Sequence, residues 1–479
     1  MDNLTGTLLG LAHVVAASLV TLNVLLAHRE VRSSIGWIAL AWLSPFIGSS
    51  IYLAFGVNRI ARRARRLGPP GGGSALEAGT RASEILNRVP TSGIMSIALA
   101  GDAISRLELT RGNSLELFRD GDAAYPAMLD AIAKADHSIA LASYIFASDA
   151  IGNRFADALI AANRRGVAVR VLADGIGSGY FRAPVLARLH AGGVKVGRFL
   201  HDWAPWAMTF INLRNHKKML IIDGKIAFTG GMNISDKNVS GANHCPQVRD
   251  VQGKIEGPVV RQLMQNFRAD WSFTTGEELM GEAWWPKIDI VGSKSDDGIP
   301  MRGIASGPDE SLGRIEAMLA TAVEQATKRI RIVTPYFLPE DRLFEVVQRA
   351  ALRGVTVEIL VPEKTNHFYF NWAMAAHLEA FFMDGIDCYL SPEPFDHTKL
   401  MSVDGYWCNL GSANWDARSM RLNFEYQVEC YGHEATSAVD AIIDAKIADA
   451  RKLTALMLAG RSIPTRLRDA SARLLLPYL

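Results

Sequence analysis

Two short segments of the sequence share one pattern of side chains that can act on a phosphate ester. Residues 215–224 read NHKKMLIIDG and residues 396–405 read DHTKLMSVDG, so each contains a His, a Lys two residues later and an Asp seven residues later. In both copies a Gly-Gly or Gly-Ser pair begins fourteen residues after the His, and an Asn stands seventeen residues after it. Two copies with matched spacing argue against a chance origin.

Two imidazoles and two ammonium groups suit a displacement at phosphorus through a covalent intermediate. One neutral His would attack, and the other, protonated, would donate to the leaving alkoxide. Ammonium and amide donors would hold the developing negative charge, and the candidate phosphate-binding residues are Lys218, Asn233, Lys399 and Asn414. The candidate catalytic set is the motif itself: His216, Lys218, Asp223, His397, Lys399 and Asp404.

An extended strand would position these groups, because side chains two residues apart point to the same face. The Asp-Gly pair that follows is a favoured hairpin turn, and it returns the chain as residues 225–228 or 406–409. The small residues and the Asn then arrive beside His and Lys. We interpret Asp223 and Asp404, at the turns, as structural residues that satisfy backbone donors.

A second repeated pattern precedes each motif. Apolar residues 138–146, a helical stretch and residues 165–172 are echoed by residues 329–337, another helical stretch and residues 353–360. Alternating strands and helices predict an α/β fold with parallel strands, and each half would end in its antiparallel hairpin.

The chain resembles the phospholipase D superfamily, and within it the bacterial cardiolipin synthases. The resemblance covers nearly the whole chain and is carried by both motifs and by the segments RNH at 214–216, AFTGG at 227–231, IEGP at 255–258, TPYF at 334–337 and LNFE at 422–425. It implies two similar halves packed about a pseudo-twofold axis, with one shared cleft.

The resemblance also implies roles for individual residues. His216 would be the nucleophile, and His397 the general acid and then the general base. Asp250 and Glu425 occupy the places of the acids that orient the two histidines. The implied reaction transfers a phosphatidyl group from one phosphatidylglycerol to another, which gives cardiolipin and glycerol.

The length of the chain and its two long apolar runs predict a membrane anchor followed by more than one domain. Residues 4–27 and 34–56 carry no charged side chain and are each long enough to cross a bilayer, so we expect two transmembrane helices rather than a cleaved signal peptide. We interpret His13, Asn23 and Pro45 as helix-packing residues. The predicted order is a membrane anchor over 1–66, a linker over 67–112, a first half over 113–280, a connection over 281–307, a second half over 308–450 and an amphipathic tail over 451–479.

Five arginines between Arg59 and Arg66 follow the second predicted span. They predict a multi-pass protein of the bacterial plasma membrane with its catalytic part in the cytoplasm, and they could also hold anionic headgroups. The tail could lie on the membrane or pack on the second half. Aromatic residues at 203–210 and 368–372 are candidates for a wall that keeps water from the intermediate, or for plain core packing.

Composition limits the partners. The 51 basic and 49 acidic residues nearly balance, which argues against nucleic-acid binding by bulk charge. The four cysteines form no C-x-x-C pair and no His cluster has metal-ligand spacing, so we predict neither a metal nor another cofactor. We expect phosphatidylglycerol and anionic membrane lipids as partners, and leave a homo-oligomer open.

Three functions compete. Transfer to a lipid alcohol is favoured by the membrane anchor and the resemblance. A phospholipase D-type hydrolase or a nuclease would use the same residues with water as the acceptor, although two membrane spans argue against the nuclease. A catalytically silent scaffold is disfavoured because both motifs are intact.

Overall fold

The computed structural model describes residues 2–26, 31–53, 86, 92–201, 212–241, 248–286, 298–381, 385–454, 456–457 and 460–474. The chain divides into an N-terminal unit, whose described helices lie between residues 2 and 53, and a larger unit that holds every described element from residue 92 onward. The Arg59–Arg66 cluster and the aromatic residues at 203–210 lie outside the described residues.

Among its described residues, the N-terminal unit contains one helix that is long and apolar enough to span a membrane, α1 (Asp2–Leu26), with its apolar stretch over Leu4–Leu26. The second predicted span is not one described helix: α2 (Val31–Leu43) ends before Pro45, and a short α3 (Ile47–Ile51) follows. Proline lacks the N–H that a helix interior needs and disfavours helical geometry in the residue before it. A second spanning helix is therefore not confirmed.

Polar side chains of α1 join these helices. His13 Nε2 lies 3.2 Å from the carbonyl oxygen of Trp42, and Tyr52 donates to Asn23 Oδ1 at 2.7 Å. Both contacts confirm that His13 and Asn23 are packing residues, because a polar group in an apolar helix is stabilised by a partner on its neighbour.

The larger unit is built on one continuous sheet. Its first half supplies the strands β1 (Thr110–Arg119), β2 (Ser138–Ser143), β3 (Ala168–Asp174), β4 (Lys195–Phe199), β5 (Arg214–Asn215), β6 (Met219–Ile222), β7 (Ile226–Gly230) and β8 (Val251–Glu256). The second half supplies β9 (Ile299–Ser306), β10 (Arg329–Val333), β12 (Thr356–Pro362), β13 (Ile386–Ser391), β14 (Leu400–Val403), β15 (Trp407–Gly411), β17 (Asn423–Tyr431) and β18 (Arg451–Lys452). A separate pair is formed by β11 (Phe337–Leu338) and β16 (Trp415–Asp416).

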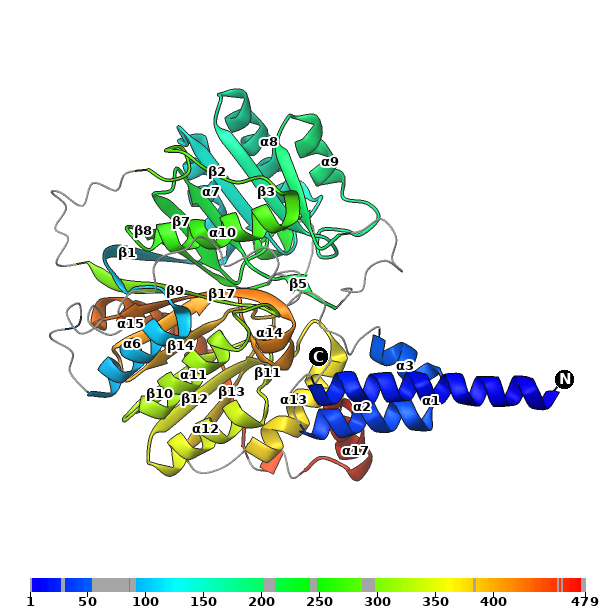
Figure 1. The fold of residues 1–479 in the computed structure, drawn as a ribbon. Helices are drawn as coiled ribbons and strands as arrows, with labels where there is room; N and C mark the ends of the chain where they lie inside the picture. The colour runs from blue at the N-terminus through cyan, green and yellow to red at the C-terminus, as the bar shows by residue number, and fades with distance from the viewer. Residues whose placement is uncertain are drawn as a thin grey trace. The chain divides into compact units, whose positions relative to one another are not determined.

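The strand order shows that the halves are alike. It runs β18-β13-β12-β10-β14-β15-β17-β9-β1-β8-β7-β6-β2-β3-β4, so equivalent strands stand at equal distances from the β9–β1 junction. In each half three strands are parallel (β2, β3 and β4, or β10, β12 and β13), and the motif hairpin beside them is antiparallel (β6 and β7, or β14 and β15). These pairings confirm the predicted α/β fold with two similar halves. Figure 1 shows the cyan and green strands of the first half continuing into the orange and yellow strands of the second.

Helices cover the sheet. The first half carries α7 (Asp120–Ala133), α8 (Ala150–Arg164), α9 (Pro184–Ala191), α10 (Val260–Thr275) and the short 3-10 helix η3 (Asp236–Asn238). The second carries α11 (Arg314–Gln325), α12 (Asp341–Leu352), α13 (Phe368–Phe381), α14 (Ala417–Arg421), α15 (His433–Ala448) and α17 (Ile463–Arg473). Each half encloses its own apolar core, and the central strands β2 and β10 are buried at nearly every position.

The globular part begins earlier than residue 113. Helix α6 (Ser92–Ser105), inside the predicted linker, buries Ile94 and Ile97 in the core of the second half. Its Asp102 pairs with Arg302 of β9, a fully buried guanidinium that also donates to Glu429. A buried arginine needs such partners, since a lone charge in the interior is strongly destabilising. The linker prediction is therefore wrong for residues 92–112.

Candidate active site

Each histidine segment pairs with the backbone of the opposite half. β5 pairs in parallel with β17, and the His216 backbone N–H donates to the Phe424 carbonyl at 2.9 Å. The His397 backbone N–H donates to the Arg249 carbonyl at 2.8 Å. This exchange places each imidazole next to an acidic residue of the other half.

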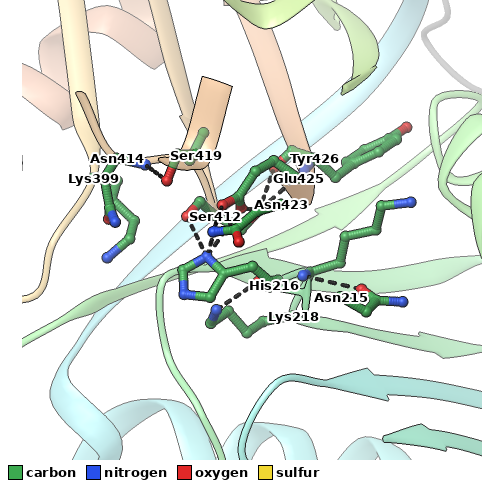
Figure 2. A network of polar contacts seen from close by, with 12 residues as sticks. Asn215, His216, Lys218, Lys399, Ser412, Asn414, Ser419, Asn423, Glu425 and Tyr426 are labelled. Carbon is green, nitrogen blue, oxygen red and sulfur yellow. Dashed lines mark hydrogen bonds and ion pairs between the residues drawn. The ribbon is translucent and has the colours of Figure 1, made fainter. Parts of the chain in front are cut away.

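His216 is held by Glu425. Its Nδ1 lies 3.0 Å from Glu425 Oε2 and 3.1 Å from the Ser412 carbonyl oxygen, and the Glu425 side chain is 0% exposed. The Ser412 hydroxyl and Asn423 Nδ2 also donate to this carboxylate (Figure 2). Because both neighbours of Nδ1 are acceptors, the proton of the neutral ring sits on Nδ1 and Nε2 carries the lone pair.

His397 is held by Asp250. Its Nδ1 lies 2.8 Å from Asp250 Oδ2, and this carboxylate is also buried. Gly231 belongs to the Gly-Gly pair of the first motif, and a Cβ there would lie 2.4 Å from Asp250 Oδ1. The glycine is required because the backbone passes against the carboxylate that orients His397.

The two imidazoles face one another. Their ring centroids are 6.4 Å apart, and the ring planes cross at 79°. The rings come from opposite halves and are close enough to act on two sides of one phosphorus atom, as displacement requires.

Two lysines flank the rings. Lys218 Nζ donates to the His216 carbonyl and Lys399 Nζ to the His397 carbonyl, each at 2.5 Å. Figure 2 shows their chains entering from opposite sides of His216. Burial lowers the pKa of Lys218 to about 7 and that of Lys399 to about 8, although carboxylates raise both in part. An entering phosphate would supply the missing counter-charge.

Both histidines are neutral at pH 7 in this state. Burial lowers the pKa of each to about 4, and the nearby lysine acts in the same direction. The pKa of Glu425 lies below its ordinary value although burial raises it, because His216 and Lys218 favour the carboxylate. A neutral ring can attack phosphorus, whereas the ring that donates a proton must first acquire one.

The two motif asparagines are oriented differently. Asn233 Oδ1 accepts from the Ile145 backbone N–H at 3.1 Å, which leaves its amide donors without a protein acceptor among the described residues. Asn414 Nδ2 donates to Asp416 at 3.0 Å, and its buried Oδ1 has no partner among the described residues.

The structure does not bring Asp223 and Asp404 to the histidines. Both stand in the hairpin turns with positive φ angles. Asp223 accepts from the backbone N–H groups of Asp136, His137 and Ser138, and Asp404 from those of Thr327, Lys328 and Arg329. Their place in the candidate catalytic set is corrected: they fix the loop that starts the first parallel strand of each half.

Several residues near the site escaped the sequence analysis. The Tyr144 ring lies 4.9 Å from the His216 ring and 5.2 Å from Lys218 Nζ. Asp174, at the end of β3, accepts from the Asn215 backbone N–H at 2.8 Å and so fixes the residue before His216. Tyr144 could have been found, because a Tyr follows the first parallel strand of both halves at 144 and 336.

Comparisons with known proteins agree with this geometry. A family model described as "Cardiolipin synthase, PLD-like domain" matches residues 128–271 and 319–447. A cardiolipin synthase of Oceanobacillus iheyensis is 30% identical over 99% of this chain and 100% of its own length, and cardiolipin synthase A of Escherichia fergusonii is 31% identical over 85% and 84%. The crystal structure of phosphatidylserine synthase from Haemophilus influenzae shares the fold, with a TM-score of 0.59 and 14% identity over 80% of this chain and all of its own. The chain belongs to the cardiolipin synthase family of phospholipase D-like proteins.

Proposed function

We propose that this protein transfers a phosphatidyl group from one phosphatidylglycerol to the glycerol hydroxyl of a second, which yields cardiolipin and glycerol. The observation that carries the proposal is the reciprocal arrangement of two oriented imidazoles and two buried lysines in a member of this family. Relatives that cover the full chain are named cardiolipin synthases, which supports the choice of reaction.

In the first step His216 Nε2 donates its electron pair to phosphorus, and the bond from phosphorus to the glycerol oxygen breaks. Protonated His397 donates its proton to that oxygen, so glycerol leaves neutral and a phosphatidyl-histidine remains. Lys218 and Lys399 stabilise the charge that develops on the non-bridging oxygens, and the amide donors of Asn233 can join them.

In the second step the acceptor hydroxyl takes the place of glycerol. Neutral His397 removes its proton as the oxygen attacks phosphorus, and the bond from phosphorus to His216 Nε2 breaks. Asp250 stabilises the imidazolium that forms, since its carboxylate contacts Nδ1 at 2.8 Å. We assign the nucleophile to His216 because its Nδ1 is held by both Glu425 and the Ser412 carbonyl, which fixes Nε2 as the unprotonated nitrogen.

Product analysis tests the proposal. The full chain is purified in detergent, mixed with phosphatidylglycerol, and its lipids and released glycerol are measured. We expect cardiolipin and glycerol in equal amounts. Phosphatidic acid as the main product would instead show that water is the acceptor, and the absence of turnover would contradict any catalytic role.

We also propose a membrane topology. The apolar helix α1 supports attachment to the bacterial plasma membrane, and the Arg59–Arg66 cluster favours two spans with the catalytic halves in the cytoplasm. A reporter that fluoresces only in the cytoplasm, fused after Leu479, should be bright. A dark fusion, with a periplasm-active reporter working at the same position, would reverse the orientation.

A further inference from the structure

Helix α17 exposes its apolar side, whereas a surface helix of a soluble protein normally buries that side. Its stripe of large apolar residues faces outward: Ile463 is 72% exposed, Leu467 64% and Leu474 80%. Four and seven residues separate them, which places all three on one side of a helix. The opposite side packs against α13 and buries Asp469 and Ala472 (Figure 1).

Arginines border this stripe. The segment from 460 to 474 contains four arginines against one acidic residue, Asp469. Arg466 and Arg473 lie at helical positions on one flank of the stripe and Arg468 on the other. The Arg468 guanidinium stands 4.6 Å from the Trp372 ring of α13, and Arg466 pairs with Glu379 at 2.8 Å, yet both side chains remain about half exposed. An apolar stripe between cations is typical of a helix lying in a membrane interface.

Exposed apolar residues of the larger unit gather in this region. In the described part of the larger unit ten large hydrophobic side chains are exposed. Five of them lie at the start of α13 or between residues 456 and 474: Phe368, Leu456, Ile463, Leu467 and Leu474. Phe368 adjoins the stripe, because its ring lies 4.8 Å from Trp372, on which Arg468 stacks. We name the exposed side chains of Phe368, Ile463, Leu467 and Leu474 the α17 face.

A row of aromatic rings leads from this face to the active site. Ring centroids are 5.5 Å apart from Phe368 to Tyr369, 5.2 Å from Tyr369 to Phe370 and 4.3 Å from Phe370 to Tyr336. Phe395 then lies 6.1 Å from Tyr336 and 5.9 Å from the His397 ring. Phe370 and Tyr336 are buried in the core of the second half, so the row is a packed connection between this face and His397.

We propose that the α17 face docks on an anionic lipid bilayer. This docking does not rest on the proposed function. The charges favour an anionic bilayer as the partner, because arginines on both flanks complement anionic headgroups. The exposed Leu and Ile side chains can enter the apolar layer of acyl chains beneath those headgroups.

Lipid-borne quenchers test the docking on the full chain. Leu467→Cys carries an environment-sensitive fluorophore, and the protein is placed in nanodiscs of phosphatidylglycerol and phosphatidylcholine. Leu352→Cys on α12 is the matched control, because Leu352 is 74% exposed in the same unit. Wild-type protein treated in the same way gives the labelling background.

We expect nitroxides on lipid acyl chains to quench the label at 467 and aqueous iodide to quench the label at 352. Quenching at 467 by iodide alone would show a face in water. Protection from both quenchers would show a face covered by protein, whether by the N-terminal helices of this chain or by a second copy. Either result overturns the proposal.

A kinetic test separates docking from chemistry. The double variant Ile463→Ser with Leu467→Ser should lose about tenfold in rate on phosphatidylglycerol bilayers and keep its rate on monomeric short-chain phosphatidylglycerol. Leu352→Ser should match wild type on both. An equal loss on both substrates would contradict docking. If wild type itself fails to convert the short-chain lipid, the proposed function fails while the quenching result stands.

Discussion

The two histidine–carboxylate pairs have the same design and different surroundings. Glu425 accepts from His216, Ser412 and Asn423, whereas Asp250 accepts from His397 and from the Val251 backbone N–H. The difference arises at equivalent positions of the motif, fifteen residues after each His, where one half has Gly231 and the other Ser412. One repeated signature thus builds two unlike sites, which suits a reaction in which one ring attacks phosphorus and the other moves a proton.

Removing either imidazole should have the largest effect. His216→Ala and His397→Ala should each lower turnover of phosphatidylglycerol by about 10⁴-fold or more, because each ring is required in both steps. A donor with a nitrophenol leaving group, which departs without a proton, should distinguish the rings. His397→Ala should still release a burst of nitrophenolate, and His216→Ala should not.

Mass spectrometry of the acid-quenched burst should find the phosphatidyl group on His216. A burst in His216→Ala, or an adduct on His397 alone, would assign the nucleophile to the second half and reverse the comparison.

Neutralising the two carboxylates should have the next largest effect. Glu425→Gln and Asp250→Asn should each cost about 10³-fold, because an amide can present its N–H to Nδ1 and favour the wrong tautomer. The nitrophenyl donor should restore the burst in Asp250→Asn and leave Glu425→Gln impaired. Equal responses to this donor would mean that the two pairs do not differ in role.

Substitution of the residue that stands fifteen positions after each His should have a smaller effect, and the effect should differ between the two halves. Ser412→Ala removes one hydrogen bond to the buried Glu425 carboxylate, and we expect a loss of about tenfold to a hundredfold in kcat. Gly231→Ala should cost more, since its Cβ would collide with Asp250. Thermal unfolding of both variants serves as the control for folding. A harmless Gly231→Ala would refute the close contact.

The pH dependence should show the smallest effect. The pKa of Lys218 is lowered to about 7 by burial, so the free enzyme loses this cation as the pH rises through that value and binds the anionic substrate less well. We expect the KM for phosphatidylglycerol to rise on the alkaline side from about pH 7. Lys218→Arg should move this rise to higher pH, and an unmoved rise would exclude Lys218.

The sequence predicted those features that depend on local pattern. The two-residue spacing of His and Lys and the Asp-Gly turns predicted the hairpins. The alternation of strands and helices predicted the parallel strands. Both predictions follow from short-range geometry. Asp223 and Asp404 show the limit: the motif groups them with the histidines, but an extended strand of seven residues separates its ends by about 20 Å.

Contacts between the halves could not be read from the chain. The contact of the Ser412 carbonyl with His216 and the β5–β17 pairing depend on how segments about 200 residues apart come into register. Pro45 interrupts the second predicted span, and the uncharged run of 23 residues that contains it does not form one helix.

The two histidine–carboxylate pairs bear on how a chain with two similar halves could have arisen. Neither half holds a complete pair, because the acid for His216 lies in the second half and the acid for His397 in the first. An ancestor with a single half would have needed an identical partner molecule before it could orient any imidazole. Joining two copies in one polypeptide removed that dependence on association. It also allowed the two copies to differ, with Asp250 and Gly231 on one side and Glu425 and Ser412 on the other.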